Sequence, residues 1–359
     1  MTTTIAPPVP SSAPFPRISV IVPVHNGAAT IERCLLAIAR NPRESLEIIV
    51  VDDRSTDRTA ELARAAGAQV IANPSGSGPG AARNAGAAVA KGEYLLFVDA
   101  DVEVQPDTVP RILEHFARHP EIAGLFGSYD DDPAAGNFAS QYRNLLHHFI
   151  HQTAERRSGS FWAGCGAIRR TVFLAVGGFD AERYPRPATE DIELGLRLSR
   201  AGHLVHVARE IQVKHLKAWT GLSMMKSDIL DRAVPWSRLI LDAGSMPADL
   251  NLRWSHRLSA VLAALLTATL LFLAFGHRNF YGIPAITAAV VAAILLLVQL
   301  LPLDGRFYGF LFRRRGLVFV IRAVPVHMLY YLYSGTTFAA CWVWHQISRA
   351  PSSRPKPLT

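Results

Sequence analysis

Short apolar runs alternate with amphipathic segments along the first hundred residues of this chain. The runs have the length of strands, and the segments between them repeat their apolar residues at helical spacing. Strands and helices that alternate in this way build a mainly parallel sheet with helices on both faces, so we expect an α/β fold. The strand-like runs are 18–24, 46–51, 69–72 and 94–98, and the helix-like segments are 28–40, 56–66 and 80–90.

Polar residues follow three of these apolar runs. Asn26 follows the first, Asp52 and Asp53 end the second, and Asp99 and Asp101 follow the run at 94–98. The carboxyl ends of parallel strands meet at one edge of a sheet, where ligands bind in folds of this class. Two carboxylates one residue apart suit a hard divalent cation, Mg²⁺ or Mn²⁺, that carries a diphosphate, although a capped turn would use the same residues.

The chain is less regular after Asp101. Helical spacing returns at 106–118, 138–157 and 190–201, and short strand-like runs follow at 204–207 and 211–215. The helix-like segment at 190–201 opens with a third acidic pair, Glu190 and Asp191. Acidic residues at a helix start are common because the helix dipole favours them there, so this pair has a structural as well as a chemical interpretation.

The last third of the chain differs in both charge and hydrophobicity. From Arg232 onward there are 13 Lys and Arg residues against 3 Asp and Glu, whereas the preceding part holds 24 and 26. This balance argues against nucleic-acid binding by the first part and for basic flanks around membrane segments. The runs 258–275 and 281–303 carry no charge and are each about long enough to span a bilayer, which needs roughly 20 apolar residues.

A third apolar run, 323–344, contains His327 and several aromatic residues. It would either span the membrane or lie in its interface, and we favour a span. Arginines gather before the first span and after the second, with Arg278 alone in the loop between them. The positive-inside rule therefore predicts that the N-terminal part faces the cytoplasm.

Five motifs occur in a fixed order: Val20-Ile-Val-Pro-Val-His-Asn26, Val51-Asp-Asp-Arg-Ser-Thr-Asp57, Ala82-Arg-Asn-Ala-Gly86, Asp99-Ala-Asp101 and Thr189-Glu-Asp191. Together they resemble the family 2 glycosyltransferases, inverting enzymes of the GT-A fold, and specifically the membrane-attached bacterial type. The resemblance covers roughly residues 17–220. It implies a nucleotide-sugar donor, usually a UDP or GDP sugar, a divalent metal (Mg²⁺ or Mn²⁺), and a place at the bacterial inner membrane with the catalytic domain in the cytoplasm.

The resemblance also assigns roles to individual residues. Asp191 would be the general base, with Glu190 beside it in the catalytic pair, and Asp101 would coordinate the metal directly. Asp99 would contact ribose or metal-bound water, and His215 would be a further metal ligand. The residues implied in binding the donor are Pro23, Val24, His25, Asn26, Asp52, Asp53, Arg83, Asp99 and Gly164.

Each of these residues also has a structural interpretation. Asp53 would cap the turn that follows it, Arg83 would be a surface residue of a helix, and His215 would be a hydrogen-bonded core histidine. Gly164, in Trp162-Ala-Gly-Cys-Gly166, would mark a tight bend of a strand rather than a close approach to a sugar.

Composition, hydropathy and the resemblance together predict a disordered tail (1–16), a catalytic domain (17–231), a basic juxtamembrane segment (232–257), a membrane region of two to three helices (258–346) and a basic tail (347–359). We expect transfer of one sugar to a membrane-associated acceptor, lipid or lipid-linked, for instance a polyprenyl phosphate. Arg232 to Trp236 matches the motif of processive polysaccharide synthases only in part, because Pro235 stands at its fourth position. A processive synthase and a non-catalytic membrane scaffold with a decayed domain are the alternatives.

Two further classes of enzyme fit the sequence less well. A dinucleotide-binding oxidoreductase would explain Gly76-x-Gly78-x-Gly80, but Pro79 interrupts that motif and the preceding strand is not the first. A nucleotidyltransferase usually places a glycine-rich loop with a basic residue after its first strand, where this chain has Pro23-Val-His-Asn26.

Overall fold

The computed structural model describes residues 17–43, 46–74, 78–244, 254–273 and 283–349. Within these ranges nine strands form one mixed sheet in the order β3-β2-β1-β4-β8-β6-β9-β5, and β7 pairs with β9. The strands are β1 (Ile18–Val24), β2 (Leu46–Asp52), β3 (Gln69–Ala72), β4 (Tyr94–Val98), β5 (Val102–Val104), β6 (Ile122–Tyr129), β7 (Arg157–Ser158), β8 (Cys165–Arg169) and β9 (Leu204–His215).

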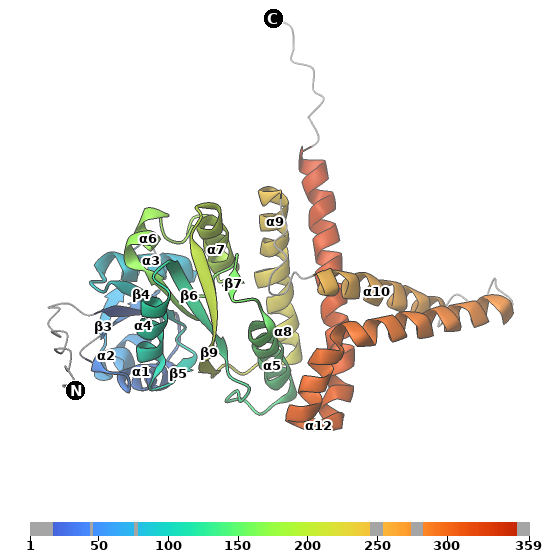
Figure 1. The fold of residues 1–359 in the computed structure, drawn as a ribbon, viewed down its shortest axis with the longest axis horizontal. Coiled ribbons are helices and arrows are strands. Elements are labelled where there is room, and N and C mark those ends of the chain that lie inside the picture. Colours follow the sequence, from blue (N-terminus) through green and yellow to red (C-terminus); the bar gives the residue numbers. More distant parts are fainter. Residues whose placement is uncertain (1–16, 44–45, 75–77, 245–253, 274–282, 350–359) are drawn as a thin grey trace, which may run out of the picture.

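Helices cover both faces of this sheet (Figure 1). One face packs against α1, α2 and α4, and the other against α3, α6 and α7. The helices are α1 (Ile31–Ala39), α2 (Thr59–Ala65), α3 (Gly78–Val89), α4 (Thr108–Arg118), α5 (Phe138–Thr153), α6 (Arg170–Ala175), α7 (Glu190–Arg200), α8 (Gly221–Ser227), the π-helical η2 (Asp228–Ala233), α9 (Val234–Ala243), α10 (Trp254–Leu271) and α12 (Ile283–Arg349).

Strand direction decides which residues share an edge of the sheet. β1, β2, β3 and β4 are parallel, as the alternating pattern predicts. β8 runs antiparallel to both β4 and β6, and β6 is parallel to β9. The carboxyl ends of β1, β2, β4, β6 and β9 therefore lie at the same edge, together with the amino end of β8.

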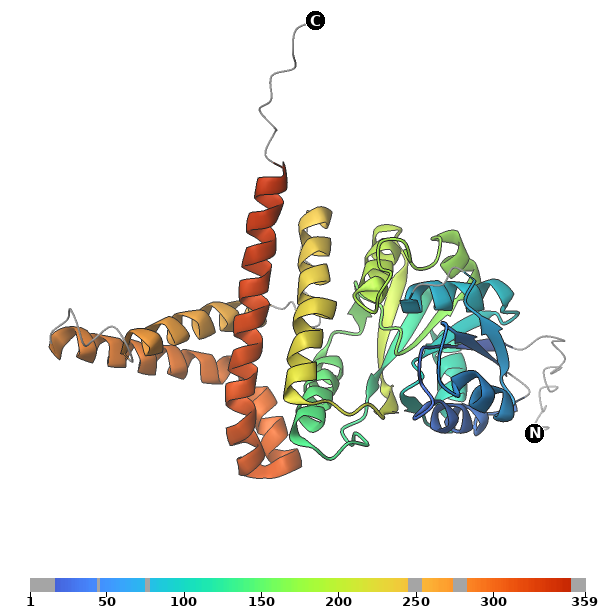
Figure 2. The ribbon, with the colours of Figure 1, turned by 180° about the vertical axis from the view of Figure 1, so that it is seen from behind.

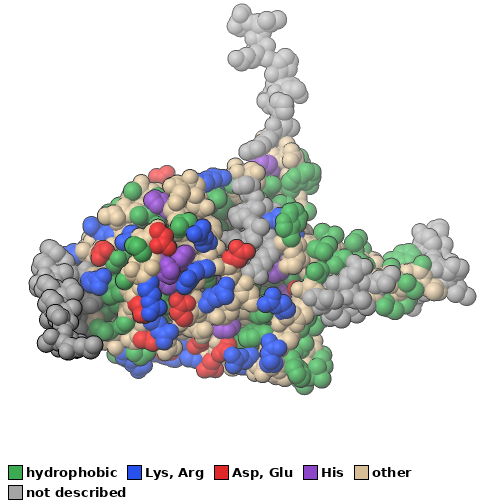
Figure 3. Space-filling model, viewed as in Figure 1, with side chains coloured by type: hydrophobic (Ala, Val, Ile, Leu, Met, Phe, Trp, Pro, Cys, Tyr) green, Lys and Arg blue, Asp and Glu red, His purple; other side chains and the backbone are tan. Residues whose placement is uncertain are grey.

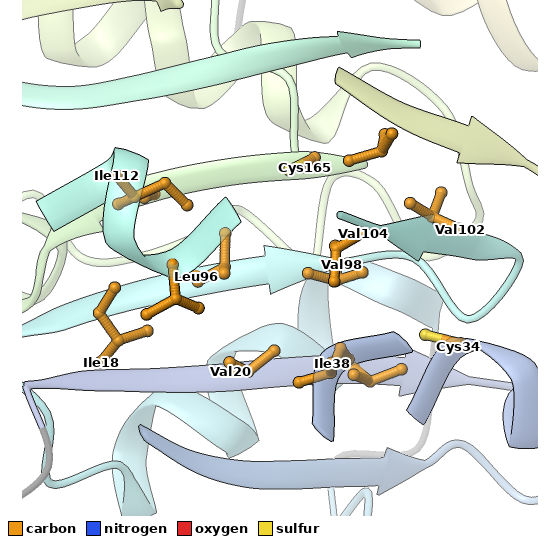
Figure 4. Close-up of a cluster of buried hydrophobic side chains, with 14 of the residues drawn as sticks. Ile18, Val20, Cys34, Ile38, Leu96, Val98, Val102, Val104, Ile112 and Cys165 are labelled. Carbon is orange, nitrogen blue, oxygen red and sulfur yellow. The ribbon is translucent and has the colours of Figure 1, made fainter. Parts of the chain in front are cut away.

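The core on the first face is built from the alternate side chains of the strands. Figure 4 shows Ile18 and Val20 of β1, Leu96 and Val98 of β4 and Cys34 of α1 among the side chains that meet there. All five are at most 1% exposed. Burying side chains of this size stabilises a fold by about 1.5–3 kcal/mol each, so the sheet is a rigid support for its edge.

The sequence predicts most of these elements with errors at their ends. β1, β3 and β4 have the predicted bounds. The two short runs at 204–207 and 211–215 belong to one continuous strand, β9, with irregular pairing to β6 between Phe126 and Ser128. The central strand β6 is absent from the sequence-based prediction.

The C-terminal part extends away from the sheet. α10 and the first part of α12 lie side by side and project to one side of the molecule, whereas the last part of α12 runs in a different direction, next to α9 (Figures 1 and 2). α12 is interrupted at Gly316, whose φ is 79°. Among the described residues, Trp254–Leu271 and Leu303–Ser348 are long and apolar enough to cross a membrane. The tails predicted at 1–16 and, for the most part, at 347–359 lie outside the described residues, as do 274–275 and 281–282 of the predicted spans.

Candidate active site

Arg83 connects two of the predicted acidic motifs. Its Nη2 donates to Asp99 Oδ1 at 2.8 Å, and its Nη1 donates to Glu190 Oε1 at 2.9 Å. The side chains of Arg83 and Glu190 are 5% and 6% exposed, so this is a buried ion pair and not the surface position that one interpretation of Arg83 predicts. α3 lies close to the sheet because Gly86 has no Cβ, which would stand 2.5 Å from Ile21. The close packing of α3 on the sheet brings Arg83 within hydrogen-bonding distance of Asp99 and Glu190.

Asp101 lies beside His215, as the resemblance implies. Val102 of β5 pairs with His215 of β9, and the carbonyl of Asp101 accepts the N–H of Leu216 at 2.8 Å. Asp101 Oδ2 is 3.7 Å from His215 Nε2, a separation longer than a hydrogen bond. Although partial burial opposes it, the neighbouring His215 lowers the pKa of Asp101. One carboxylate and one imidazole thus face each other at the edge of the sheet.

Asp191 begins α7 on the same side. Its Oδ2 accepts the N–H of Ala163 at 3.2 Å, and its Oδ1 accepts the N–H of Ile192 at 2.8 Å, so the carboxylate has a fixed orientation. Gly195 allows this, because a Cβ there would lie 2.4 Å from the backbone of Ser160. Burial, and then the charge of Glu190, raises the pKa of Asp191 to about 7. A carboxylate with this pKa is a stronger base than an exposed aspartate.

The loops after β1 and β2 hold each other by hydrogen bonds. Asn26 has a left-handed backbone with φ of 51°, and its Oδ1 accepts the N–H of Thr56 at 2.8 Å. His25 Nδ1 lies 2.8 Å from the carbonyl of Asp53. Asp52 Oδ1 accepts only a long hydrogen bond, 3.3 Å, from the N–H of Ser55. The side chains of His25 and Asn26 are exposed, so they and Asp52 are open to a ligand.

Asp53 has a structural role in the next loop. Its Oδ1 accepts from Asn73 Nδ2 and its Oδ2 from the N–H of Gly78, both at 2.9 Å. These bonds fasten the start of α3, rather than the turn that directly follows Asp53. Gly78 in turn lies against Pro185, because a Cβ at Gly78 would be 2.6 Å from the Pro185 carbonyl. The start of α3 that Asp53 holds is therefore next to the segment that leads to Glu190.

Val24 and Pro23 fit the predicted donor pocket less well. The Val24 side chain is 5% exposed and packs in the core, and its carbonyl accepts the N–H of Asp53 at 2.8 Å. Pro23 is buried inside the sheet, opposite Val51. Gly164 is at the site: its carbonyl accepts the N–H of Asp99 at 3.2 Å, and a Cβ would lie 2.4 Å from the ring of Trp162. That close contact explains the glycine without reference to a sugar.

The sequence did not single out the aromatic residues behind the site. The ring of Tyr129 stacks on His215 with a centroid distance of 4.4 Å and meets Trp162 edge to face at 4.9 Å. Lys217 is also near, since its charge acts on Asp101. Tyr129 is the last residue of β6, a strand that the sequence-based prediction omits. Lys217 lies two residues after His215, so the same resemblance that pointed to His215 could have drawn attention to it.

The site brings together most of the predicted residues. Asp99, Glu190 and Asp191 surround Arg83, and Asp101 and His215 form a second pair one residue away from Asp99. Asp101 and His215 offer an oxygen and a nitrogen, a donor set that fits a divalent cation such as Mn²⁺, whereas Mg²⁺ prefers oxygen alone. The arrangement is suited to binding an anionic leaving group and to removing a proton.

Comparison with known proteins finds similarity to one family over part of the chain. Residues 19–177 match the model described as "Glycosyl transferase family 2". The validoxylamine A glucosyltransferase of Streptomyces hygroscopicus subsp. jinggangensis is 30% identical over an alignment of 231 residues, and the match covers 54% of this chain and 54% of that protein. The undecaprenyl-phosphate 4-deoxy-4-formamido-L-arabinose transferase of Pseudomonas paraeruginosa is 32% identical over an alignment of 142 residues, and the match covers 37% of this chain and 42% of that protein. This chain thus spans about half the length of the curated relatives it matches.

One solved structure is similar over most of the chain. The mannosyltransferase of Pyrobaculum calidifontis, in complex with GDP-mannose and Mn²⁺, shares 18% identity with a TM-score of 0.47, and the match covers 94% of this chain and 88% of that one.

Proposed function

We propose that this chain carries a family 2 glycosyltransferase domain over the matched residues 19–177, and that this domain transfers a sugar from a UDP or GDP sugar to an acceptor at the membrane with inversion at the anomeric carbon. One observation carries the proposal: six charged or polar side chains from distant parts of the chain meet at one edge of the sheet. They are Arg83, Asp99, Asp101, Glu190, Asp191 and His215.

Asp191 would act as the general base. It accepts the proton of the acceptor hydroxyl while the acceptor oxygen bonds to the anomeric carbon, and the nucleoside diphosphate leaves with the electrons of the broken C–O bond. Two backbone N–H groups hold the Asp191 carboxylate in place, and its pKa of about 7 matches proton transfer near neutral pH. The hydrogen bond from Arg83 Nη1 holds the Glu190 side chain in position next to Asp191.

Asp101 and His215 would hold a divalent metal, with Asp99 as a neighbouring carboxylate. A bound metal neutralises the negative charge that grows on the leaving diphosphate. Lys217 is placed to add positive charge on the same side of Asp101. If His215 coordinates through its nitrogen, Mn²⁺ is favoured over Mg²⁺.

Three observations support a lipid or lipid-linked acceptor. The C-terminal third is basic, and two helical stretches are long and apolar enough to span a bilayer. One of the matched relatives is named as an undecaprenyl-phosphate sugar transferase. A cavity of about 420 Å³ between α5 and α12 has Phe149 and Phe310 together with Arg306 and Arg313 in its wall, a lining suited to an apolar chain with an anionic head. We place the domain at the cytoplasmic face of the bacterial inner membrane.

The proposal is tested with purified full-length protein, a panel of UDP and GDP sugars and Mn²⁺. We expect one donor to raise the melting temperature in the presence of Mn²⁺ and to be consumed faster when polyprenyl phosphate is added. Asp101→Ala should remove the effect of Mn²⁺ on donor binding. Absence of binding and turnover with every donor would favour a non-catalytic scaffold, and an Asp101→Ala variant that binds as tightly as wild type would refute the metal assignment.

A further inference from the structure

Three histidines meet at the end of the sheet opposite the candidate active site. His115 and His119 lie one turn apart at the end of α4, and His206 lies near the beginning of β9. Their ring centroids are 4.9, 5.1 and 5.5 Å apart. Histidine side chains show as a patch near the middle of the face seen in Figure 3.

The separation of their nitrogen atoms matches the coordination of a transition metal. One nitrogen from each of the three rings lies within 4.8 Å of the other two. His115 Nε2 and His206 Nδ1 are 3.2 Å apart. Two ligands of a tetrahedral Zn²⁺ with Zn–N bonds of about 2.0–2.1 Å stand about 3.3 Å apart, so these two nitrogens already have the spacing that the metal requires.

Carboxylates orient the two histidines of α4. His115 Nδ1 lies 3.2 Å from Glu210 Oε1, and His119 Nδ1 lies 3.5 Å from Glu121 Oε1. A carboxylate that accepts the Nδ1 proton fixes the tautomer and leaves the Nε2 lone pair available to a metal. His119 directly follows the last residue of α4, four positions after His115, and the two ring centroids are 4.9 Å apart.

The burial of the cluster suits a closed site with one entrance. His115 and His206 are 6% and 4% exposed, whereas the side chain of His119 is 24% exposed. A metal can therefore enter past His119, and water can take the fourth position. The hydrogen bond between His115 and His206 explains why these two rings lie together. It does not explain why the ring of His119 packs against both of them.

We propose that His115, His119 and His206 bind a transition-metal ion, with Zn²⁺ as the preferred ion, in a site separate from the sugar-nucleotide site. His206 and His215 are nine positions apart on β9, which is roughly 30 Å along a strand. The ligands also differ, because three imidazoles select Zn²⁺ or Co²⁺, whereas the carboxylates at the other edge select Mn²⁺ or Mg²⁺. Such an ion would tie α4 to β9 and so support the fold.

Cobalt is the probe for this site, since Co²⁺ in a tetrahedral protein site absorbs visible light strongly. Tag-free full-length protein is stripped with EDTA and titrated with Co²⁺. We expect one equivalent to bind with tetrahedral absorption, and Zn²⁺ to displace it. His203→Gln is the control, because it removes a histidine three positions before His206 that lies outside the cluster. It should give the same tetrahedral Co²⁺ absorption as the wild type.

His119→Gln and His206→Gln should weaken Co²⁺ binding about 100-fold or more. His119 is the partly exposed ligand, so His119→Gln should disturb folding less than His206→Gln. If the His206 variant does not fold, the Co²⁺ affinity of His119→Gln tests the proposal. Zn²⁺ should raise the melting temperature of the wild type and leave that of His119→Gln unchanged, while both melt alike in EDTA. Wild-type protein without tetrahedral Co²⁺ absorption, or a His119→Gln variant with unchanged Co²⁺ affinity, would overturn the proposal and leave a hydrogen-bonded histidine cluster.

Discussion

Arg83 is the residue on which the geometry of the site depends. Its guanidinium binds Asp99, from the end of β4, and Glu190, from the start of α7. The family resemblance implies that Arg83 lies near a nucleotide, but a pattern of residues does not say which carboxylates a buried cation will meet. That information depends on α3 packing against β1, where Gly86 meets Ile21.

Replacing Arg83 with Gln should destabilise the protein by about 3 kcal/mol, because Glu190 would remain buried without its partner. The melting temperature should fall by about 6–12 °C. Arg33→Gln is the matched control: it breaks an exposed pair with Glu103, in which the Arg33 side chain is 54% exposed, and should cost at most about 1 kcal/mol. Equal losses of stability from the two substitutions would mean that the ion pairs of Arg83 stabilise the protein no more than an exposed ion pair does.

Asp191→Asn should reduce sugar transfer by about 10²–10⁴-fold and leave donor affinity nearly unchanged, because an amide keeps the shape of the carboxylate but accepts no proton. Single-turnover transfer and calorimetric donor binding measure the two effects separately. Glu61→Gln, an exposed substitution on α2, is the control. A parallel loss of binding and transfer would identify Asp191 as a structural residue.

The pH dependence of transfer should follow the same carboxylate. Asp191 works as a base only when it is deprotonated, and its pKa is raised to about 7, so kcat/KM should rise with pH up to about 7 and then level off. An exposed aspartate would give a rise near its ordinary pKa of about 4 instead. A profile that is flat from pH 5 to pH 8 would contradict the role given to Asp191.

At the scale of elements, the sequence predicts the first half of the sheet well and the second half poorly. β1 and β4 are apolar except for Ser19 of β1, and such runs indicate buried parallel strands. β6 is equally buried but contains Gly124 and Gly127, and glycine is unfavourable in strands. Close packing requires a glycine at both positions. A Cβ at Gly124 would lie 3.0 Å from the carbonyl oxygen of Ala167, and a Cβ at Gly127 would lie 2.4 Å from the carbonyl oxygen of Ile211.

The placement of α7 also depends on a glycine. Gly195→Ala puts a methyl group against the backbone of Ser160, which cannot yield as a side chain would, so α7 and its first residues Glu190 and Asp191 must shift. We expect kcat to fall at least about tenfold with a smaller change in donor KM, since a small displacement of a catalytic group has a large effect. Gly221→Ala is the control, because nothing lies within 4 Å of that position. Unchanged kcat would show that α7 tolerates the shift.

At the scale of the whole molecule, the two apolar parts of the C-terminal region differ in direction. α10 and the first part of α12 point away from the sheet, and the last part of α12 runs across them (Figures 1 and 2). Membrane-spanning helices tilt by at most about 40° from the bilayer normal, so helices that cross at a steep angle do not all span. If the α10–α12 pair spans, residues 317–349 lie in the interface, contrary to the span that we favoured from the sequence.

Spin labels on single cysteines test this arrangement. Val318, Leu329 and Ile347 are all exposed, at 72%, 47% and 65%. In liposomes we expect the three labels to have similar depths, whereas a span would separate the outer two by about 43 Å at 1.5 Å per residue. Labels at Val261 and Leu271 of α10 provide the reference, since they should differ in depth by about 15 Å if α10 spans. A steady change of depth from Val318 to Ile347 would show that this part crosses the bilayer.

The backbone hydrogen bond between Asp101 and Leu216 has a consequence for biosynthesis. The carbonyl of Asp101 is held by an N–H that lies 115 positions later in the chain. A nascent polypeptide on the ribosome therefore contains its first four parallel strands well before the metal site that we propose can form. Until translation passes Leu216, we expect such a chain to turn over no sugar nucleotide.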